Sequence, residues 1–402
     1  MRSRLLCLAC IASAKQPIEA ELSAESRSAI LAMTGLYTDA RAAGNGANAT
    51  VLLTSANWGY RGLLFSWMCR AAELGLKYAV HAHDERLHAY LRERAHPRSP
   101  STTFSVFREA SLAGAESERF EELGGAGFAR ATCAKAALLR AVMEQLRVDV
   151  WFSDADVAFV RDPWPSFARA ACDVQYATFT PHARRPPSAA ELFDVARGPG
   201  GGAKLDKLAR HPVNTGFVLW RASDAAVALA RAIDGECSAQ LRSVANASDQ
   251  SATNVGVLWQ YLAKKNRTRH ARIALPRVQL ELLGTTFDWR SGLAGGVYAP
   301  RPFTRGDDAR FYMCPLPMLV ATLGFYFFDR RPWEEAEAKV GHQMLASVHA
   351  AQAGPLHGKD AKLAALKGLA SWALKPGVDT RGEQGGLAFP GSCRGLPYSR
   401  MI

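Results

Sequence analysis

Hydrophobic positions follow two alternating patterns along the chain from Val51 onward. Short apolar runs, which predict buried strands, alternate with longer segments whose apolar residues recur every three to four positions, which predict amphipathic helices. This alternation is typical of an α/β domain. The predicted strands are residues 51–54, 78–80, 148–152, 173–180, 216–220 and 347–349, and the predicted helices are residues 60–74, 85–94, 128–147, 224–233, 250–264 and 360–372.

The start of the chain has a different pattern. A basic opening is followed by a small apolar run that ends in Ala-Ser-Ala, and this order predicts a secretory signal peptide over residues 1–14. Three Asn-x-Ser/Thr sequons agree with secretion. We predict that residues 15–48 form a stem or a peripheral helix, and we expect the N-terminus to be the part of the chain that can associate with a membrane.

Composition narrows the classes of partner. Apolar residues make up 48% of the chain and charged residues 21%, which is ordinary globular usage and argues against disorder. The formal net charge of +12 favours anionic partners such as phosphates, acidic polysaccharides or membrane surfaces. A basic run at residues 264–272 lacks the interleaved aromatic residues of a nucleic-acid platform, so no nucleic-acid partner is expected. The cysteines beyond the signal peptide lack paired ligand spacing, which argues against zinc and leaves disulfide pairing open.

The sharpest local signal is Asp154-Ala-Asp156, at the end of an apolar strand. Alternate residues of a strand point to the same side, and a bend at the strand end lets both carboxylates reach one centre. Two carboxylates this close favour a cation between them, and hard oxygen ligands suit Mn²⁺ or Mg²⁺, which substrate phosphates commonly complete. The pair therefore predicts a Mn²⁺ or Mg²⁺ site at the carboxyl end of the sheet, where open α/β sheets bind ligands. The alternative is a solvated turn with a capping Asp.

Two more polar groups lie on predicted helices. Lys135 shares the core-facing stripe of its helix and is predicted to lie near the helix N-terminus, where a cation opposes the macrodipole. A docked anion would explain this lysine, and an aliphatic stem laid along apolar surface is the alternative. Asp249 and Gln250 follow Ser248 at a helix start, where an N-cap explains them equally well.

The last group lies near the C-terminus. His349 ends a predicted strand, and Gly358 and Lys359 precede a predicted helix. A glycine that allows close backbone approach and a lysine that adds charge fit a metal-bound diphosphate. His357 competes with His349 for this role, and a surface or core histidine is the alternative for each.

These motifs together resemble the nucleotide-diphospho-sugar transferase family, in particular the plant and algal glycosyltransferase family 77 of arabinosyl-, xylosyl- and related transferases. The likeness runs from Val51 to about Trp372, and its most specific blocks are the D-x-D strand with its following Arg-Asp-Pro and the block NTGFVLWR. It implies a GT-A fold: a Rossmann-like α/β domain with a mixed central sheet that binds a nucleotide sugar, and an adjoining acceptor-binding half. Residues 49–375 would form this glycosyltransferase domain, and residues 376–402 a C-terminal tail.

The resemblance also implies roles for single residues. Asp154 and Asp156 look like metal and diphosphate ligands, and His349 looks like a third metal ligand. Asp249 and Gln250 resemble a catalytic pair that touches the sugar or the acceptor. The residues that resemble the nucleotide-sugar-binding set are Thr54, Asn57, Lys135, Asp154, Asp156, Asn214, Thr215, Gly216, His349, Gly358 and Lys359.

The activity that the resemblance implies is metal-dependent transfer of a pentose or hexose from a nucleoside diphosphate sugar, such as a UDP-sugar, to a hydroxyl of a glycan or glycoprotein. Retention at the anomeric carbon is expected, with Asp249 as the first candidate nucleophile. The family and the signal-like start together predict a location in the Golgi lumen or outside the cell. The alternatives are an inactive, glycan-binding secretory protein and an Asp-nucleophile phosphatase, which Ala158 disfavours because such enzymes carry Thr or Val there.

Overall fold

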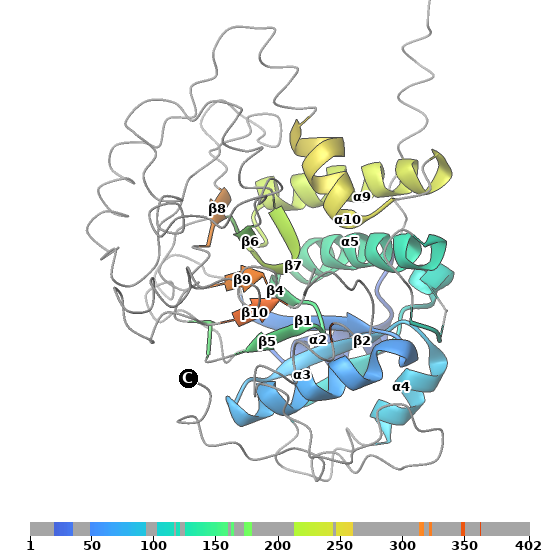
Figure 1. Ribbon diagram of the computed structural model, residues 1–402, viewed down its shortest axis with the longest axis vertical. Helices are drawn as coiled ribbons and strands as arrows, with labels where there is room; N and C mark the ends of the chain where they lie inside the picture. Colours follow the sequence, from blue (N-terminus) through green and yellow to red (C-terminus); the bar gives the residue numbers. More distant parts are fainter. Residues whose placement is uncertain are drawn as a thin grey trace, which may run out of the picture.

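The computed structural model of the protein describes residues 20–34, 49–93, 103–115, 118–120, 125–159, 162–164, 173–178, 213–243, 247–259, 313–316, 321–323, 347–349 and 362. These residues form a mixed seven-stranded sheet with helices on both faces, and a separate three-stranded sheet (Figure 1). The strands are β1 (Thr50–Ala56), β2 (Tyr78–Ala82), β3 (Phe104–Phe107), β4 (Asp149–Ser153), β5 (Val157–Phe159), β6 (Val174–Thr178), β7 (Val213–Trp220), β8 (Met313–Pro315), β9 (Ala321–Leu323) and β10 (Ser347–His349). The helices are α2 (Ala24–Ala32), η2 (Trp58–Tyr60), α3 (Arg61–Glu73), α4 (Glu85–Arg92), η3 (Ala110–Ala115), α5 (Ala126–Leu146), α9 (Asp224–Ser243), α10 (Asp249–Ser251) and the π-helix η4 (Ala252–Trp259).

The larger sheet has the strand order β3-β2-β1-β4-β7-β6-β8. Strands β3, β2, β1 and β4 are parallel, so their carboxyl ends meet at one edge. Strand β7 runs antiparallel to both β4 and β6, and β8 is parallel to β6. In the smaller sheet, β10 lies between β5 and β9, antiparallel to β5 and parallel to β9. This mixed α/β architecture confirms the predicted fold class.

Alternation along the strands divides the core in two. Val51 and Leu53 of β1 pack with α5 and α9, whereas Leu52 and Ala56 pack with α3 on the opposite face. Buried apolar side chains lie on both faces, as expected for parallel strands covered by helices on each side. The face that a strand residue occupies therefore follows from its position in the strand.

The N-terminal segment joins this core. Helix α2 begins after its N-cap Ser23, and Ile30 of the helix is fully buried. The backbone N–H of Leu22 donates to Gln145 Oε1 of α5 at 3.1 Å, and Ser105 Oγ of β3 donates to the carbonyl of Ala29 at 2.7 Å. Of the two alternatives for residues 15–48, the described part is thus a helix docked on the domain. None of the described helices is both long enough and apolar enough to cross a bilayer.

Most of the predicted elements are present. All six predicted strands are confirmed, as are the helices predicted at 60–74, 85–94 and 128–147, with shifts of a few residues at their ends. The helix predicted at 360–372 and the end of the one at 250–264 lie outside the described residues. Strands β3, β5, β8 and β9, each three or four residues long, were not predicted.

Helix α9 departs from its predicted end at residue 233 and continues to Ser243. The sequence shows a glycine at 235, a residue that weakens helices. Contacts with α5 on both sides of it favour the longer helix: Arg140 Nε donates to Asp234 Oδ2 at 2.8 Å, and Cys133 forms a disulfide with Cys237. Tertiary contacts here outweigh local propensity.

Candidate active site

The D-x-D motif forms a turn between β4 and β5. Asp154 directly follows β4, and its backbone N–H donates to the carbonyl of Gly216 in β7 at 2.7 Å. The N–H of Val157 donates back to the carbonyl of Asp154 at 3.1 Å, which closes the turn. Asp156 is buried, whereas the Asp154 side chain is 32% exposed. The predicted bend at the strand end is thus confirmed.

Helix α3 supports both sides of this turn. Trp67 Nε1 donates to Ser153 Oγ at 3.0 Å, and Ser153 Oγ in turn donates to the carbonyl of Asp154 at 3.2 Å. On the other side, Arg70 Nε donates to the carbonyl of Phe159 at 2.7 Å. Trp67, Ser153 and Arg70 are all buried, so these bonds compete little with water.

A buried lysine joins three segments of the site. Lys135 Nζ lies 2.7 Å from Asp249 Oδ2, 3.3 Å from Asp154 Oδ1 and 3.4 Å from the carbonyl oxygen of Thr215. Burial by itself lowers the pKa of Lys135, but the charges of Asp154 and Asp249 outweigh it and hold this pKa above its ordinary value. The ammonium group therefore stays charged and bridges two carboxylates from different elements. We call Lys135, Asp154, Asp249 and Thr215 the lysine cluster.

One prediction about this lysine is wrong. Lys135 lies in the middle of the 21-residue helix α5, not near its N-terminus, because the helix begins at Ala126 and includes Gly127. The macrodipole acts within the first and last turns, so it does not explain this residue. The anions beside Lys135 are carboxylates of the protein itself.

The NTG segment of β7 and the start of α10 form the walls around Lys135. Asn214 is buried, and its Oδ1 accepts a hydrogen bond from the N–H of Gly216 at 2.9 Å. Ser248 caps α10 by accepting from the N–H of Ser251 at 3.0 Å. Asp249, one residue later, is free of the capping role and points to Lys135.

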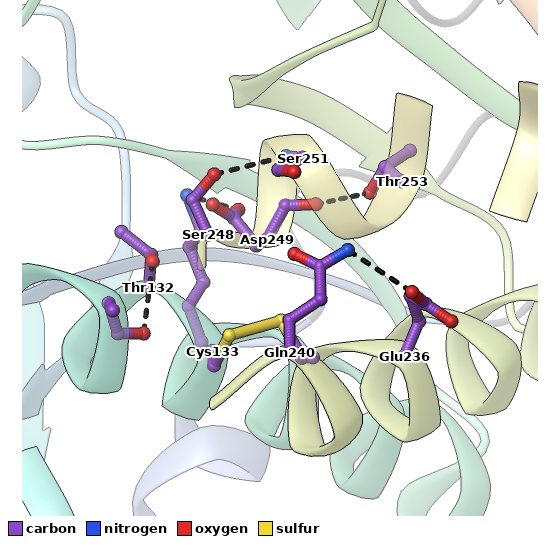
Figure 2. The surroundings of a disulfide bond; sticks show 11 residues. Thr132, Cys133, Glu236, Gln240, Ser248, Asp249, Ser251 and Thr253 are labelled. Carbon is purple, nitrogen blue, oxygen red and sulfur yellow. Dashed lines mark hydrogen bonds and ion pairs between the residues drawn. A yellow bond between two sulfur atoms is a disulfide. The ribbon is translucent and has the colours of Figure 1, made fainter. Parts of the chain in front are cut away.

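A disulfide lies directly behind this wall. Cys133 of α5 and Cys237 of α9 are joined, and Figure 2 shows the bond close to the start of α10, which carries Asp249. Thr253 Oγ1 donates to the carbonyl of Asp249 at 2.7 Å in the same view. The disulfide therefore links the helix that carries Lys135 to the helix that precedes α10.

Two predicted nucleotide-binding residues lie away from the lysine cluster. Thr54 is buried on the α3 face of β1, in phase with Leu52, and its hydroxyl makes no hydrogen bond with any described residue. Asn57 caps η2: its Oδ1 accepts from the N–H of Tyr60 at 3.2 Å and its Nδ2 donates to the carbonyl of Arg119 at 2.7 Å. Their roles in a nucleotide pocket stay predictions.

Strand β10 lies beside the D-x-D turn. His349 pairs in register with Val157, the residue after Asp156. The side chain of His349, and residues His357, Gly358 and Lys359, lie outside the described part of the chain. Further along the chain, Lys362 places its Nζ 2.5 Å from Asp156 Oδ2. Sequence reasoning missed this contact, although Lys362 lies only three residues after Lys359, a predicted nucleotide-sugar-binding residue.

Two histidines form a further feature that sequence reasoning missed. His81 lies in β2 and His83 directly follows its last residue, with ring centroids 4.9 Å apart. Burial, and secondly the charge of Lys135, lower the pKa of His83 to about 4. His83 is therefore neutral at physiological pH, and its Nδ1 makes no hydrogen bond with a described residue. A lone histidine in a strand carries no sequence signal for this role.

The fold and site together define a class of protein. A mixed α/β sheet with a D-x-D turn at its carboxyl edge is consistent with the GT-A glycosyltransferases. A family model described as nucleotide-diphospho-sugar transferase matches residues 76–364. The chain therefore belongs to the nucleotide-diphospho-sugar transferase family.

Among solved structures, the crystal structure of the glycosyltransferase GlyE of Streptococcus pneumoniae is similar at 10% sequence identity and a TM-score of 0.29. The likeness covers 80% of this chain and 60% of the GlyE chain, so this chain spans less than two thirds of that enzyme. A similarity this distant carries no argument about the site. A search of curated proteins finds no match.

Proposed function

We propose that this protein is a glycosyltransferase that moves a sugar from a nucleoside diphosphate sugar, with a UDP-sugar as the first candidate, to a hydroxyl of a glycan or glycoprotein. The family match supports a nucleotide-sugar donor and an acceptor. The observation that carries the proposal is the lysine cluster, in which one buried ammonium group holds the D-x-D turn and α10 together at the carboxyl edge of the sheet. That edge is where open α/β sheets bind their ligands.

The D-x-D turn fits a divalent cation. Each of its two carboxylates pairs with a separate ammonium group, that of Lys135 for Asp154 and that of Lys362 for Asp156, which supports a turn that attracts positive charge. The described residues alone hold no group of three or more His, Cys, Asp or Glu able to bind a metal. His349 pairs with Val157 directly beside the turn, and we propose that Asp154 and Asp156 hold Mn²⁺ or Mg²⁺ together with His349. When bound, this ion would neutralise the diphosphate as it leaves.

The chain's own residues would align the reacting groups. Lys135 forms an ion pair with Asp249 and fixes its position, and the backbone carbonyls of Thr215 and Gly216 hold the donor-facing strand against Lys135 and the turn. For a retaining reaction, a carboxylate oxygen of Asp249 would bond to the anomeric carbon as the bond to the diphosphate breaks. The acceptor oxygen would then attack the anomeric carbon from the face that the diphosphate had left, displace the Asp249 carboxylate, and pass its proton to the released diphosphate. Gln250, the next residue, would contact the sugar or the acceptor.

The proposed location is the Golgi lumen or the outside of the cell. The buried Cys133–Cys237 disulfide supports it, because disulfides form and persist in oxidising compartments. Cell fractionation of a tagged protein, with a glycosidase shift to detect N-glycans, tests this location. A cytosolic, unglycosylated protein would contradict it.

The activity is tested by measuring nucleoside diphosphate release from a panel of UDP-sugars, with and without Mn²⁺. Thermal shift with the same ligands gives a readout that does not need the acceptor, because a ligand that binds only the folded state raises its melting temperature. Asp156→Asn should lose the Mn²⁺-dependent shift, whereas Asp224→Asn, at a side chain that is 94% exposed, is the matched control. Full activity in Asp156→Asn would refute the metal site. Glycan binding without any response to nucleotide or Mn²⁺ would favour an inactive, glycan-binding protein.

A further inference from the structure

Asn254 connects two walls of the site through its side-chain amide. Its Oδ1 accepts from the N–H of Val213 at 2.8 Å, and its Nδ2 donates to the carbonyl of Val213 at 2.8 Å and to that of Gln250 at 3.0 Å. The amide thus pairs with Val213 as the backbone of a neighbouring strand would. It also binds the same helix end that carries Asp249.

The first residues of β7 have a strand partner in β6 but none in β4. The ladder of β7 with β4 ends where Phe217 pairs with Ser153, so the first residues of β7 extend beyond β4. This extension contains Thr215, whose carbonyl faces Lys135, and Gly216, whose carbonyl holds the D-x-D turn. Strand β6 still pairs with this extension on its other side, where Thr178 is in register with Val213, and Asn254 supplies strand-like pairing for Val213 beyond the end of the β4 ladder.

The helix that carries Asn254 is shaped for this contact. Asn254 lies in the π-helix η4, a wide turn that is rare and is often found at functional sites. The preceding residue, Thr253, donates to the carbonyl of Asp249 at 2.7 Å (Figure 2). Two successive side chains of this helix therefore hold α10, and the second of them also holds β7.

We propose that Asn254 is a positioning residue of the transfer site: it fixes the start of β7 against α10, so that Thr215 and Asp249 meet at Lys135. This inference rests on the proposed function. It predicts that loss of the amide weakens binding of the nucleotide and slows transfer by more than its effect on stability explains.

The chain offers a matched control in Gln145, which also makes three hydrogen bonds through one amide. Its Oε1 accepts from the N–H of Leu22 and from Arg27 Nη2, and its Nε2 donates to the carbonyl of Ala20. Gln145 ties the N-terminal segment to the far end of α5, about 15 Å along the helix from Lys135 at 1.5 Å per residue. Gln145→Ala therefore removes three hydrogen bonds, as Asn254→Ala does, without changing a residue of the site.

The experiment compares Asn254→Ala with Gln145→Ala by thermal unfolding, by calorimetric titration with UDP and Mn²⁺, and by kcat and KM for the donor. Both variants should lower the melting temperature by similar amounts, and only Asn254→Ala should weaken UDP binding or lower kcat/KM, by tenfold or more. Asn254→Asp, which is isosteric and keeps one of the three bonds, gives a second test if the alanine variant does not fold. Equal behaviour of the Asn254 and Gln145 variants, with normal UDP binding by the wild type, would overturn the positioning role. Absence of UDP binding in the wild type would instead refute the proposed function.

Discussion

Replacing Lys135 with methionine tests the lysine cluster most directly. The substitution keeps most of the aliphatic stem and removes the ammonium group from between Asp154 and Asp249. Lys135 and Asp249 have side chains only 5% and 7% exposed, so the variant leaves a buried carboxylate without its cation. Removing one partner of a buried pair costs about 3–5 kcal/mol. The Asp154 contact adds little to this cost, because that side chain is 32% exposed and water screens it.

The pH dependence of this effect has a defined sign. Because the pKa of Lys135 in the fold lies above its ordinary value of 10.5, its stabilising contribution is complete below pH 10.5 and is lost only as the pH rises through the raised pKa. The wild type should therefore keep this contribution throughout the neutral range. In Lys135→Met, the penalty comes from a buried anion, so it should be larger at pH 8 than at pH 4.5, where protonation relieves it.

Urea unfolding followed by tryptophan fluorescence at the two pH values measures these differences. The double variant Lys135→Met with Asp249→Asn removes the charge from both sides and should recover most of the lost stability. A single variant within 1 kcal/mol of the wild type, or a double variant no more stable than the single one, would refute the reasoning.

Three more predictions follow from single features. As the pH falls from 6.5 to about 4, the unfolded chain gains a proton that buried His83 does not bind, so stability should fall by about 3 kcal/mol in urea titrations and His83→Leu should flatten this change. Gly59→Ala would place a methyl group 2.2 Å from the backbone nitrogen of Phe120, and calorimetry should show a lower melting temperature from a loss of about 1–3 kcal/mol; an unchanged value would mean that this segment moves freely. Replacing Cys133 and Cys237 with alanine opens a link across 104 residues and should lower the free energy of unfolding by about 4–5 kcal/mol under non-reducing conditions.

The sequence predicts elements well where a local pattern is long enough to carry them. The buried strand before Asp154 and the helix over residues 61–73, which ends before Gly75 with its positive φ, both match their patterns. The C-terminal end of α9 and the start of β7 do not, because both depend on partners far away in the chain. Asp234 and Cys237 extend α9 through their contacts with α5, and Asn254 pairs with the polar start of β7.

The site was predicted in parts rather than as an arrangement. Residue chemistry singled out Asp154 and Lys135, and the family resemblance singled out Asp249, but no spacing rule states that one lysine would bridge both carboxylates. For strand residues, a shift of one position moves a side chain to the other face of the sheet. Thr54 lies on the α3 face of β1, in phase with Leu52. The side chain of Asn254 binds backbone atoms of Val213 and Gln250, and because backbone atoms are the same for every residue type, the sequence does not identify these partners.

The pairing of β10 with β5 constrains the order in which the strands can fold during translation. Residues 157–159 are made early, but their partners at residues 347–349 emerge from the ribosome only when most of the chain has been translated. Contacts between such distant segments form slowly, because the entropy of closing a long loop is lost before the contacts contribute any stability. The nascent polypeptide can thus assemble the parallel strands β1 to β4 first, whereas β5, beside Asp156, can pair with β10 only after residues 347–349 have been made. Premature termination before residue 347 would remove the partner of β5, so a shortened product would be prone to associate through that exposed strand.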